Sequence, residues 1–578
     1  MILSASGWRD VFSIDGNEEG KGGEIDMLHK KFAVCAAKVF ADYVRSLIGG
    51  ESTIVVGMDT RPTGRSIADT VMRSLVNSGC TVLFAGVTAA PEIMAFASHA
   101  KNISAFIYIS ASHNPIGHNG IKFGLTDGGV LPGKEIQKLI DCFHKIFDDE
   151  SLSSALLEGA EKVSQEIIDK IITDSARVKK LSLKHYYDFT NEIVFDKQTG
   201  ITIKGNCSDK QIGVCADLNG SARTLSIDAQ YFADQGIKFA AINDAPGMIA
   251  HKIVPEDDAL LPCCRFLEEQ HLKDKSFVLG YVPDCDGDRG NIVIWDEGKN
   301  ASRALEAQEV FALAVLSELS FLLYCGKADN LAIAVNDPTS MRIDHICAAF
   351  GAEVYRAEVG EANVVSLGRQ LRQEGKTVRI LGEGSAGGNI THPSAVRDPI
   401  DTVMSIVKLL TLRSSENKKG LFEIWCEQSG QKRKYKNDFT LADIISTMPS
   451  FFTTGTYSED AVLKISIKDH AEFKRAYQII FVKEWEEKKD ILKKSFGITD
   501  WEACAYNGTE ERENIADFGI AGKGGLKIYF LCGDFYTAAI WMRGSATEPV
   551  FRIMADAADA DLERILIKWQ KDMVLKNR

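Results

Sequence analysis

Three aspartates alternate with small residues in the segment DCDGDRG, at Asp284, Asp286 and Asp288. A tight turn of this composition can direct three carboxylates at one point, and carboxylate oxygens are the ligands that Mg²⁺ prefers. A calcium EF-hand loop also begins D-x-D-x-D, but it requires glycine where Arg289 stands and glutamate where Trp295 stands. Apolar segments flank the turn, so a merely solvated acidic loop is the weaker alternative. The segment therefore predicts a magnesium site, with Arg289 facing a further anion such as a phosphate or a carboxylate of the loop.

A serine that could act as a nucleophile follows the apolar run AFIYI, in the segment SASHNP. The hydroxyl of Ser112 can attack only if a neighbour activates it and another group stabilises the charge, which a divalent metal would do. Gly117 and Gly120 allow close backbone approach, and Lys122, which we place at the start of the strand IKFG, could move protons at a sugar hydroxyl. Adjacent residues rarely face one another, so the pair Ser112 and His113 is weak evidence by itself. A plain turn with a hydrogen-bonded His113 is the alternative.

The segment RGSATEP has the composition of an anion-binding loop. Arg543 supplies a planar fork of donors, Ser545 and Thr547 supply hydroxyls, and the backbone N–H groups of the turn, including that of Ala546, form a nest for an anion. Arg552, on the following strand, could add a second guanidinium. A plain hairpin loop is the alternative.

The segment GEGSAGG contains Glu383 and Ser385, which can bind two neighbouring hydroxyls of a sugar. Its glycines leave the site open. Taken alone, the segment fits a flexible turn without a ligand equally well.

Three of these four loops end units of the same kind. In each unit an apolar strand leads through a turn rich in Asp, Asn, Gly or Pro into a helix, and a second and a third strand follow. This alternation predicts βαβ units and mainly parallel sheets covered on both faces, although chance recurrence in a long α/β chain is the alternative. Ligands of such sheets lie outside the carboxyl ends of the strands, where all three loops fall. The first strands are TIVVGM, QIGVCAD and LAIAVN, the second are TVLFAGV, IKFAAIN and AEVYRAE, and the third are AFIYIS, FVLGYVP and VRILGE.

The last part of the sequence has another pattern. LKIYFLCGDFYTAAIWMRG predicts two strands around a turn at Gly533 and Asp534, and a third strand follows in VFRIMAD, which is typical of an antiparallel α+β domain. We therefore expect an α/β protein with three related αβα domains of mainly parallel mixed sheets, and a C-terminal antiparallel α+β domain, around a central cleft.

Four expected domains follow from this pattern. A helix-like run at 186–195, the segment GKNASRA, which we expect to lead into a long helix, and a polar run at 415–420 mark the boundaries. The expected domains are 1–197, 198–303, 304–420 and 421–578.

The composition limits the classes of partner. A chain of 578 residues with 45% hydrophobic and 25% charged residues is typical of multidomain globular proteins, and its net charge of −13 argues against nucleic acid or an anionic membrane as the main partner. The apolar run FALAVLSELSFLLYC is shorter than a membrane span requires and predicts a buried helix. Thirteen cysteines without a C-x-x-C pair, and an N-terminus without a signal-like apolar core, indicate reduced thiols in a cytoplasm.

Taken together, SASHNP, DCDGDRG, GEGSAGG and RGSATEP, in this order, resemble the four active-site loops of the α-D-phosphohexomutase superfamily, which includes phosphoglucomutases and phosphomannomutases. The resemblance extends from SGWRD near the start to VFRIMAD near the end, and VVGMDTRPTG and DLNGSA also resemble family segments. Four matched loops on three repeats are a far more specific signal than any one loop.

The resemblance implies a mechanism. Ser112 would carry a phosphoryl group, and its phosphate oxygen and the three aspartates would bind Mg²⁺. The phosphoserine would interconvert hexose 1-phosphate and hexose 6-phosphate through a hexose 1,6-bisphosphate, which is both intermediate and activator. This bisphosphate would rotate end over end in the site between the two phosphoryl transfers. The four expected domains would then be the phosphoserine, metal-binding, sugar-binding and phosphate-binding domains.

The resemblance also implies roles for individual residues. Lys122 would be the general acid/base, with His113 in the same catalytic loop and Arg289 beside the reacting phosphate. The remaining residues would bind the sugar (Glu383, Ser385, Gly360) and the non-reacting phosphate (Arg543, Ser545, Ala546, Thr547, Arg552), and Arg9 would line the same cleft.

Several positions depart from the family pattern. Ser110 stands where threonine is usual, and GEGSAGG matches neither the usual phosphoglucomutase form nor the usual phosphomannomutase form, which leaves the preferred sugar open. Glu361 stands where some members have histidine or lysine, so no catalytic base is assigned there. The segments 15–23 and 415–436 resemble surface insertions.

Two other functions are compatible with parts of the sequence. A phosphatase of the haloacid dehalogenase type also has D-x-D-G after a strand, with Asp284 as nucleophile, but such enzymes usually have threonine or valine where Asp288 stands. A non-catalytic sugar-phosphate sensor would retain the fold. The expected partners of the chain are small sugar phosphates, and we expect a monomer or a homodimer.

Overall fold

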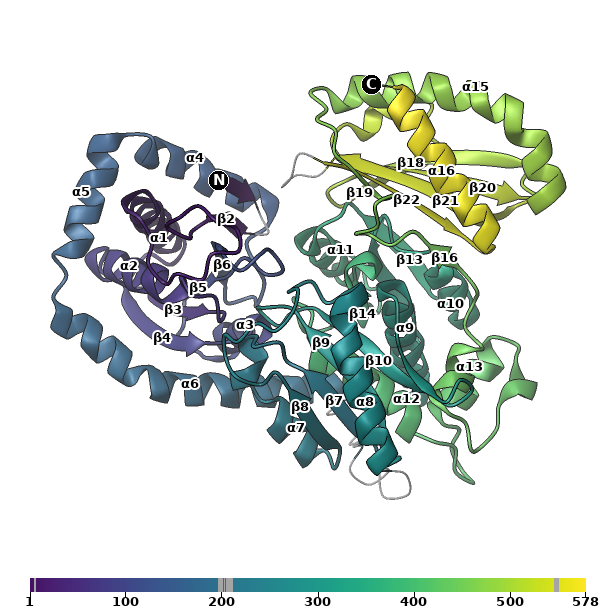
Figure 1. Ribbon diagram of the computed structural model, residues 1–578, viewed down its shortest axis with the longest axis horizontal. Coiled ribbons are helices and arrows are strands. Elements are labelled where there is room, and N and C mark those ends of the chain that lie inside the picture. Colours follow the sequence, from purple (N-terminus) through teal and green to yellow (C-terminus); the bar gives the residue numbers. More distant parts are fainter. Residues whose placement is uncertain (5–6, 196–200, 202, 204–210, 545–549, 578) are drawn as a thin grey trace. The chain divides into compact units, whose positions relative to one another are not determined.

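The computed structural model describes residues 1–4, 7–195, 201, 203, 211–544 and 550–577 (Figure 1). The chain forms two compact units. The first unit consists of residues 1–305 and 393–407, and the second of residues 306–392 and 408–578.

The first sheet of the first unit has six strands in the order β1-β2-β6-β5-β3-β4. Strand β3 is parallel to both β4 and β5, whereas β6 is antiparallel to β5 and β2. Helices cover this sheet around a core that includes Trp8, Phe32 and Phe123. The elements are β1 (Ile2–Ser4), β2 (Gly7–Val11), α1 (Met27–Ile48), β3 (Thr53–Met58), α2 (Gly64–Asn77), β4 (Thr81–Val87), α3 (Ala90–His99), β5 (Ala105–Ile109), β6 (His118–Leu125), α4 (Gly133–Phe147), α5 (Glu150–Glu161) and α6 (Gln165–Val194).

The second sheet of this unit has five strands in the order β11-β10-β9-β7-β8. Strand β7 is parallel to β8 and β9, and the hairpin β9–β10 is antiparallel. The elements are β7 (Gly213–Asp217), α7 (Asp228–Asp234), β8 (Lys238–Ile242), α8 (Leu261–Lys273), β9 (Phe277–Pro283), β10 (Gly290–Asp296) and β11 (Ala301–Ala304).

The third sheet lies in the second unit and has four strands in the order β13-β12-β14-β15. Strand β12 is parallel to β13 and β14, and β15 is antiparallel to β14. The elements of this region are α9 (Ala307–Tyr324), β12 (Ala332–Asn336), α10 (Arg342–Phe350), β13 (Glu353–Ala357), α11 (Glu361–Gln373), β14 (Ile380–Gly382), β15 (Ile390–Thr391) and α13 (Leu421–Gln428). Helix α12 (Pro399–Thr411) begins in the first unit and ends in the second.

The three sheets share one strand order, which confirms the predicted repeat. In each sheet the first strand of the repeat lies between the second and the third, and these three strands run parallel. The next strand of the chain is antiparallel to the third. The orders are β4-β3-β5-β6, β8-β7-β9-β10 and β13-β12-β14-β15. The loops after β5, β9 and β14 therefore occupy equivalent positions, and each of them contains one of the predicted chemical segments.

The C-terminal sheet is antiparallel, as the sequence predicts. Strands β20 and β21 form a hairpin, and Gly533 in its turn has φ +62°, a left-handed conformation that favours glycine. Helices α15 and α16 bury Tyr477, Phe481 and Trp569 against the sheet (Figure 1). The elements are α14 (Leu441–Ile445), β16 (Phe452–Thr453), β17 (Val462–Leu463), α15 (His470–Phe496), β18 (Asp500–Asn507), β19 (Glu510–Arg512), β20 (Gly525–Cys532), β21 (Phe535–Gly544), β22 (Phe551–Ala557) and α16 (Ala560–Lys576).

Helix α9 is long and apolar enough to cross a membrane, but 78% of its residues are buried inside the structure. Its buried Glu318 is paired with Lys408 and with Arg379. This is the buried helix that the sequence predicts.

Three local expectations were wrong. The segment 415–436 is not a surface insertion, because α13 buries Trp425 and Cys426. The segment GKNASRA does not lead directly into a helix but forms strand β11, antiparallel to β10, since residues 301–304 complete the edge of the second sheet. Strand β6 begins at His118, so Lys122 lies in its middle and not at its start.

Candidate active site

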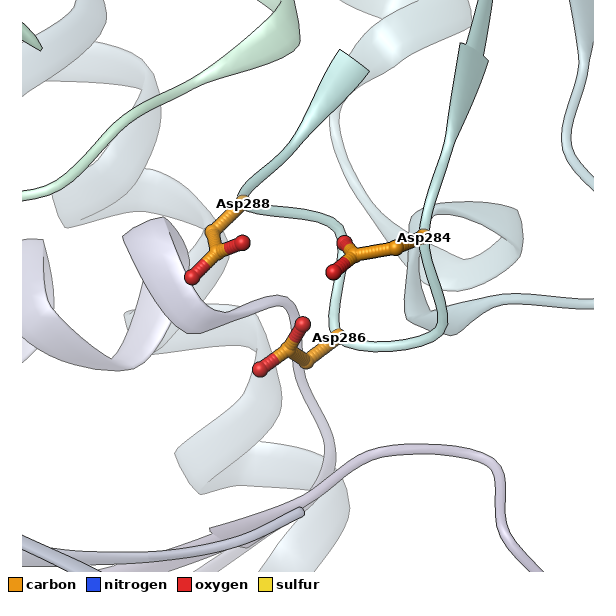
Figure 2. A group of neighbouring side chains, drawn as sticks. All are labelled: Asp284, Asp286 and Asp288. Atoms are coloured by element: carbon orange, nitrogen blue, oxygen red, sulfur yellow. The ribbon is translucent and has the colours of Figure 1, made fainter. Parts of the chain in front are cut away.

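The three predicted metal-binding aspartates lie on the turn between β9 and β10. All three carboxylates are buried, and one oxygen from each lies within 4.8 Å of the other two. Figure 2 shows the three side chains on this single turn, with their carboxylates facing a common space. Gly287 makes the turn possible, because it has φ +70° and a Cβ there would lie 2.5 Å from Arg223 Cδ.

The electrostatics of this turn are those of a cation site. Burial, with the charges of Asp286 and Asp288, holds the pKa of Asp284 well above its usual range. Burial acts to raise the pKa of Asp286, but the ammonium of Lys122, a hydrogen bond with Asp284 and the charge of Arg289 together lower it more, so the net pKa is lowered. Oδ1 of Asp286 is buried and accepts no hydrogen bond from the described residues. Buried carboxylates with an unused acceptor oxygen suit a hard divalent cation, so these residues fit Mg²⁺.

Ser112 lies beside the acidic turn. Its Oγ donates a hydrogen bond of 2.9 Å to Asp284 Oδ2. Its backbone is in the left-handed region with φ +53°, which is unusual for a residue other than glycine. Ser110 holds this conformation, because its Oγ accepts from Ser112 N at 2.8 Å and donates to Asp286 Oδ2 at 3.1 Å. The loop that contains Ser110 and Ser112 and the acidic turn are therefore joined by two hydrogen bonds.

Lys122 reaches the same turn from β6. Its Nζ donates to Asp286 Oδ2 at 2.6 Å. Burial lowers the pKa of Lys122, but Asp286 and Asp288 raise it more, so the net pKa is above its ordinary value. Lys122 is therefore an ammonium in this arrangement, placed to give a proton to an oxygen atom at the site.

The other predicted residues of this unit surround the serine. Arg289 Nε is 3.8 Å from Asp284 Oδ2, and Arg9 Nη1 donates to the Asn114 side chain at 3.3 Å. His113 Nδ1 is 3.5 Å from Ser112 Oγ. Burial and then the charges of Arg289 and Arg9 hold the pKa of His113 well below its usual range, so its ring is neutral at physiological pH.

Two arginines at this site were missed by the sequence analysis. Arg61 is buried and its guanidinium donates to the carbonyl oxygens of Ser112 at 2.7 Å and Asn114 at 2.6 Å, so it positions the loop that contains Ser112. The segment VVGMDTRPTG contains it and could have indicated it. Arg397 Nη2 is 3.6 Å from Asp288 Oδ1, although more than a hundred residues separate them. No sequence signal marked Arg397, because residues 393–407 join the first unit only in the folded chain.

The predicted sugar-binding residues lie together in the second unit. Glu383 Oε1 accepts from Asn336 Nδ2 at 3.2 Å and from Gly360 N at 2.8 Å. Asn336 Nδ2 also donates to Ser385 Oγ at 3.1 Å. Gly360 has φ +131°, which favours glycine. Asn336, at the end of β12, thus holds two of the three predicted sugar ligands, Glu383 and Ser385, and it was not singled out from the sequence.

The predicted phosphate-binding arginines are neighbours on the C-terminal sheet. Arg543 on β21 is paired with Arg552 on β22. Arg543 donates from Nε at 2.9 Å and from Nη2 at 2.7 Å to Glu358 Oε1, a partner that the sequence did not indicate. Arg552 Nη1 donates to Thr456 O at 2.8 Å. Three further predicted ligands lie outside the described residues: Ser545, Ala546 and Thr547.

The two units thus contain different chemical groups. The first has a serine hydroxyl, a buried triad of carboxylates, an ammonium and several guanidinium groups, which suit transfer of an anionic group such as phosphoryl. The second has a carboxylate and a hydroxyl that can bind sugar hydroxyls, and arginines that can bind an anion.

Two family models match the chain. Residues 11–150 match "Phosphoglucomutase/phosphomannomutase, alpha/beta/alpha domain I", and residues 313–428 match "Phosphoglucomutase/phosphomannomutase, alpha/beta/alpha domain III". The first match contains Ser112 and Lys122, and the second contains Glu383 and Ser385.

Curated relatives are similar at low identity. The phosphoglucosamine mutase of Methanococcus vannielii is 26% identical over 368 residues, which cover 63% of this chain and 70% of that protein. The phosphoglucosamine mutase of Nitratiruptor is 28% identical over 418 residues, which cover 72% of this chain and 82% of that protein.

Solved structures share the fold. A phosphoglucomutase/phosphomannomutase family protein from Burkholderia thailandensis has a TM-score of 0.59 at 15% identity and covers 100% of this chain and 97% of its own. The open form of pp63/parafusin, a phosphoglucomutase from Paramecium, has a TM-score of 0.60 at 15% identity and covers 99% of this chain and 94% of its own. This chain thus contains two domains that match those of phosphoglucomutase/phosphomannomutase proteins, shares the fold of solved proteins of that family, and has curated relatives that are mutases.

Proposed function

We propose that this chain interconverts hexose 1-phosphate and hexose 6-phosphate through a phosphorylated Ser112 and a hexose 1,6-bisphosphate intermediate. The observation that carries the proposal is the hydrogen bond of 2.9 Å from Ser112 Oγ to Asp284, at the edge of a buried triad of aspartates. Asp284, Asp286 and Asp288 would hold Mg²⁺, which when bound supplies positive charge that neutralises the transferring phosphoryl group.

The residues of the first unit would carry out the transfer. The bond from Ser112 Oγ to phosphorus breaks and a bond from a hexose hydroxyl oxygen to phosphorus forms. Lys122 donates a proton to the serine oxygen and then takes the proton that the hydroxyl loses. Arg289 and Arg9 balance the charge of the phosphoryl group, and the neutral ring of His113 adds no charge beside the serine. Transfer of the other phosphate back to Ser112 completes the reaction.

The residues of the second unit would hold the part of the substrate that does not react. Glu383 and Ser385 would bind sugar hydroxyls, and Arg543 and Arg552 would bind the non-reacting phosphate, together with the loop from Ser545 to Thr547. We propose four functional domains accordingly, at 1–197, 198–303, 304–420 and 421–578. The proposed partners are small sugar phosphates, and the proposed setting is a cytoplasmic monomer or homodimer.

The preferred sugar is proposed from the relatives and not from the site. Phosphoglucosamine mutases are the curated relatives described above, so glucosamine phosphate joins glucose and mannose phosphates as a candidate substrate. Relative kcat/KM values for the 1-phosphates of glucose, mannose, glucosamine and N-acetylglucosamine would decide among them.

The test of the proposed function is phosphorylation and turnover with Mg²⁺ and a hexose 1,6-bisphosphate primer. We expect a stable phosphate ester on Ser112 by phosphopeptide mapping, and we expect Ser112→Ala to abolish turnover while substrate still binds. An acyl phosphate on Asp284, labile to hydroxylamine, would instead identify a phosphatase of the haloacid dehalogenase type. Absence of turnover with all four sugars would favour a non-catalytic sensor.

A further inference from the structure

Arg543, the arginine that we propose as a phosphate ligand, forms an ion pair with Glu358 of the same unit. Both Nε and Nη2 of Arg543 donate to one oxygen of Glu358, at 2.9 and 2.7 Å. The two side chains are largely buried, with 16% of Arg543 and 18% of Glu358 exposed. An arginine has five N–H donors, so this pairing takes two of them and orients the planar guanidinium.

Glu358 is itself held at a fixed position. Its second oxygen accepts from Gly508 N at 2.9 Å. Its own N–H donates to Gly508 O, also at 2.9 Å. Gly508 has φ +61° and lies in the turn between β18 and β19, so Glu358 is bonded to this turn by both its backbone and its side chain. An ion pair with these additional hydrogen bonds has less conformational freedom than an ordinary surface ion pair, whose net contribution to stability is small.

The same short segment also reaches the predicted sugar site. Glu358 is two residues from Gly360, whose N–H donates to Glu383 Oε1 at 2.8 Å. Residues 358–360 therefore connect the guanidinium of Arg543 to the carboxylate of Glu383 through fixed hydrogen bonds. The arrangement sets where an anion can approach the arginine relative to the sugar ligands.

We propose that Glu358 is a positioning residue and permanent counter-ion of Arg543, which orients the guanidinium and weakens its hold on phosphate. This inference rests on the proposed function, because it takes Arg543 as the ligand of the non-reacting phosphate. A mutase that exchanges the two phosphates of a bisphosphate must release each phosphate in every turnover. An arginine without a counter-ion would bind phosphate more tightly than such a cycle tolerates, since tighter binding of an intermediate slows its reorientation.

The test separates the charge of Glu358 from its hydrogen bonds with Arg543. Glu358→Gln keeps a carbonyl oxygen that can accept from Arg543 but removes the charge and the oxygen that accepts from Gly508 N, whereas Glu358→Ala removes all three. Calorimetric titration with inorganic phosphate is expected to show about fivefold tighter binding for Glu358→Gln, from the loss of one negative charge beside the anion. Glu358→Ala should bind phosphate more weakly than Glu358→Gln, because the guanidinium loses its orientation. For Glu358→Gln we expect KM and kcat to fall together.

Two controls make the result specific. Glu353→Gln makes the same change of charge at the first residue of β13, about 16 Å along the strand by the usual rise per residue, where the carboxylate pairs with Lys376. It should leave phosphate binding unchanged. In an Arg543→Ala background, Glu358→Gln should no longer tighten binding, which shows that the effect acts through the arginine.

The outcomes that overturn the inference are distinct from failure of the proposed function. If Glu358→Gln binds phosphate as weakly as Glu358→Ala, or binds it like the wild type, Glu358 is not a counter-ion that limits affinity. Circular dichroism and melting temperature would establish that each variant is folded before it is titrated. If the wild type shows no mutase turnover, the proposed function fails, yet the titrations still report on the pairing of Glu358 with Arg543.

Discussion

Ser110 is predicted to position the nucleophile without touching the substrate. Its hydroxyl accepts from the backbone N–H of Ser112 and donates to Asp286 Oδ2, at 2.8 and 3.1 Å. In Ser110→Ala both hydrogen bonds are lost, so the buried N–H of Ser112 and one oxygen of Asp286 lose a partner. The left-handed backbone of Ser112, with φ +53°, also loses a contact that maintains it.

The expected loss of turnover follows from these two bonds. A hydrogen bond to a charged group contributes about 1.5–3 kcal/mol, and an unpaired buried N–H costs about 1–3 kcal/mol. Part of this stabilisation is lost from the ground state as well as from the transition state. We therefore expect the activation free energy of phosphoryl transfer to rise by about 1.4–2.7 kcal/mol, which corresponds to a decrease in kcat of about 10-fold to 100-fold. KM should change little, because Ser110 is not itself a proposed substrate ligand.

Initial rates with a hexose 1-phosphate, Mg²⁺ and the bisphosphate primer would measure the effect, alongside the extent of Ser112 phosphorylation. Ser110→Thr is the matched control, because threonine keeps the hydroxyl and is the usual residue of the family at this position. It should restore most of the activity. A kcat for Ser110→Ala within twofold of the wild type would refute the positioning role, and so would a Thr variant no better than the Ala variant.

Three further outcomes are expected. Arg543→Ala should raise KM for hexose phosphates by about 10-fold to 150-fold with a smaller loss of kcat, since it removes a charge-assisted hydrogen bond; steady-state kinetics with an unchanged KM would contradict the proposed phosphate site. Chelation of divalent metal should abolish phosphoryl transfer and lower the melting temperature, and added Mg²⁺ should restore both; full activity after exhaustive chelation would argue against a metal at Asp284. Burial raises the pKa of Asp337 to about 7 although Trp541 Nε1 donates to its carboxylate. The folded state therefore binds this proton more tightly than the unfolded chain, so stability should fall as pH rises from about 4 to 7. In Asp337→Asn the melting temperature should decline less over that range, and an identical decline would show that Asp337 does not titrate there.

Local chemistry made much of the fold predictable. The three βαβ repeats can be recognised in the sequence because buried β-strands of parallel sheets are continuous apolar runs, and the turns that follow them are rich in glycine and aspartate. The same applies to the hairpin at Gly533, where a left-handed conformation favours glycine. Short local patterns predicted edge strands and short helices less reliably, as β11 and α13 show. Tertiary packing decides whether a polar segment completes a sheet and whether a short helix is buried.

The sequence by itself determined the repeated strand units, the acidic turn at 284–288 and the serine at 112, because each depends on neighbouring residues in one segment. Only the tertiary structure decided which distant groups meet: Ser112 with Asp284, Arg61 with the carbonyl oxygen of Ser112, and Glu358 with Arg543. The physical reason is that hydrogen bonds and ion pairs act over a few ångströms. The partner of a charged side chain is therefore set by the packing of whole sheets and not by its neighbours in the chain.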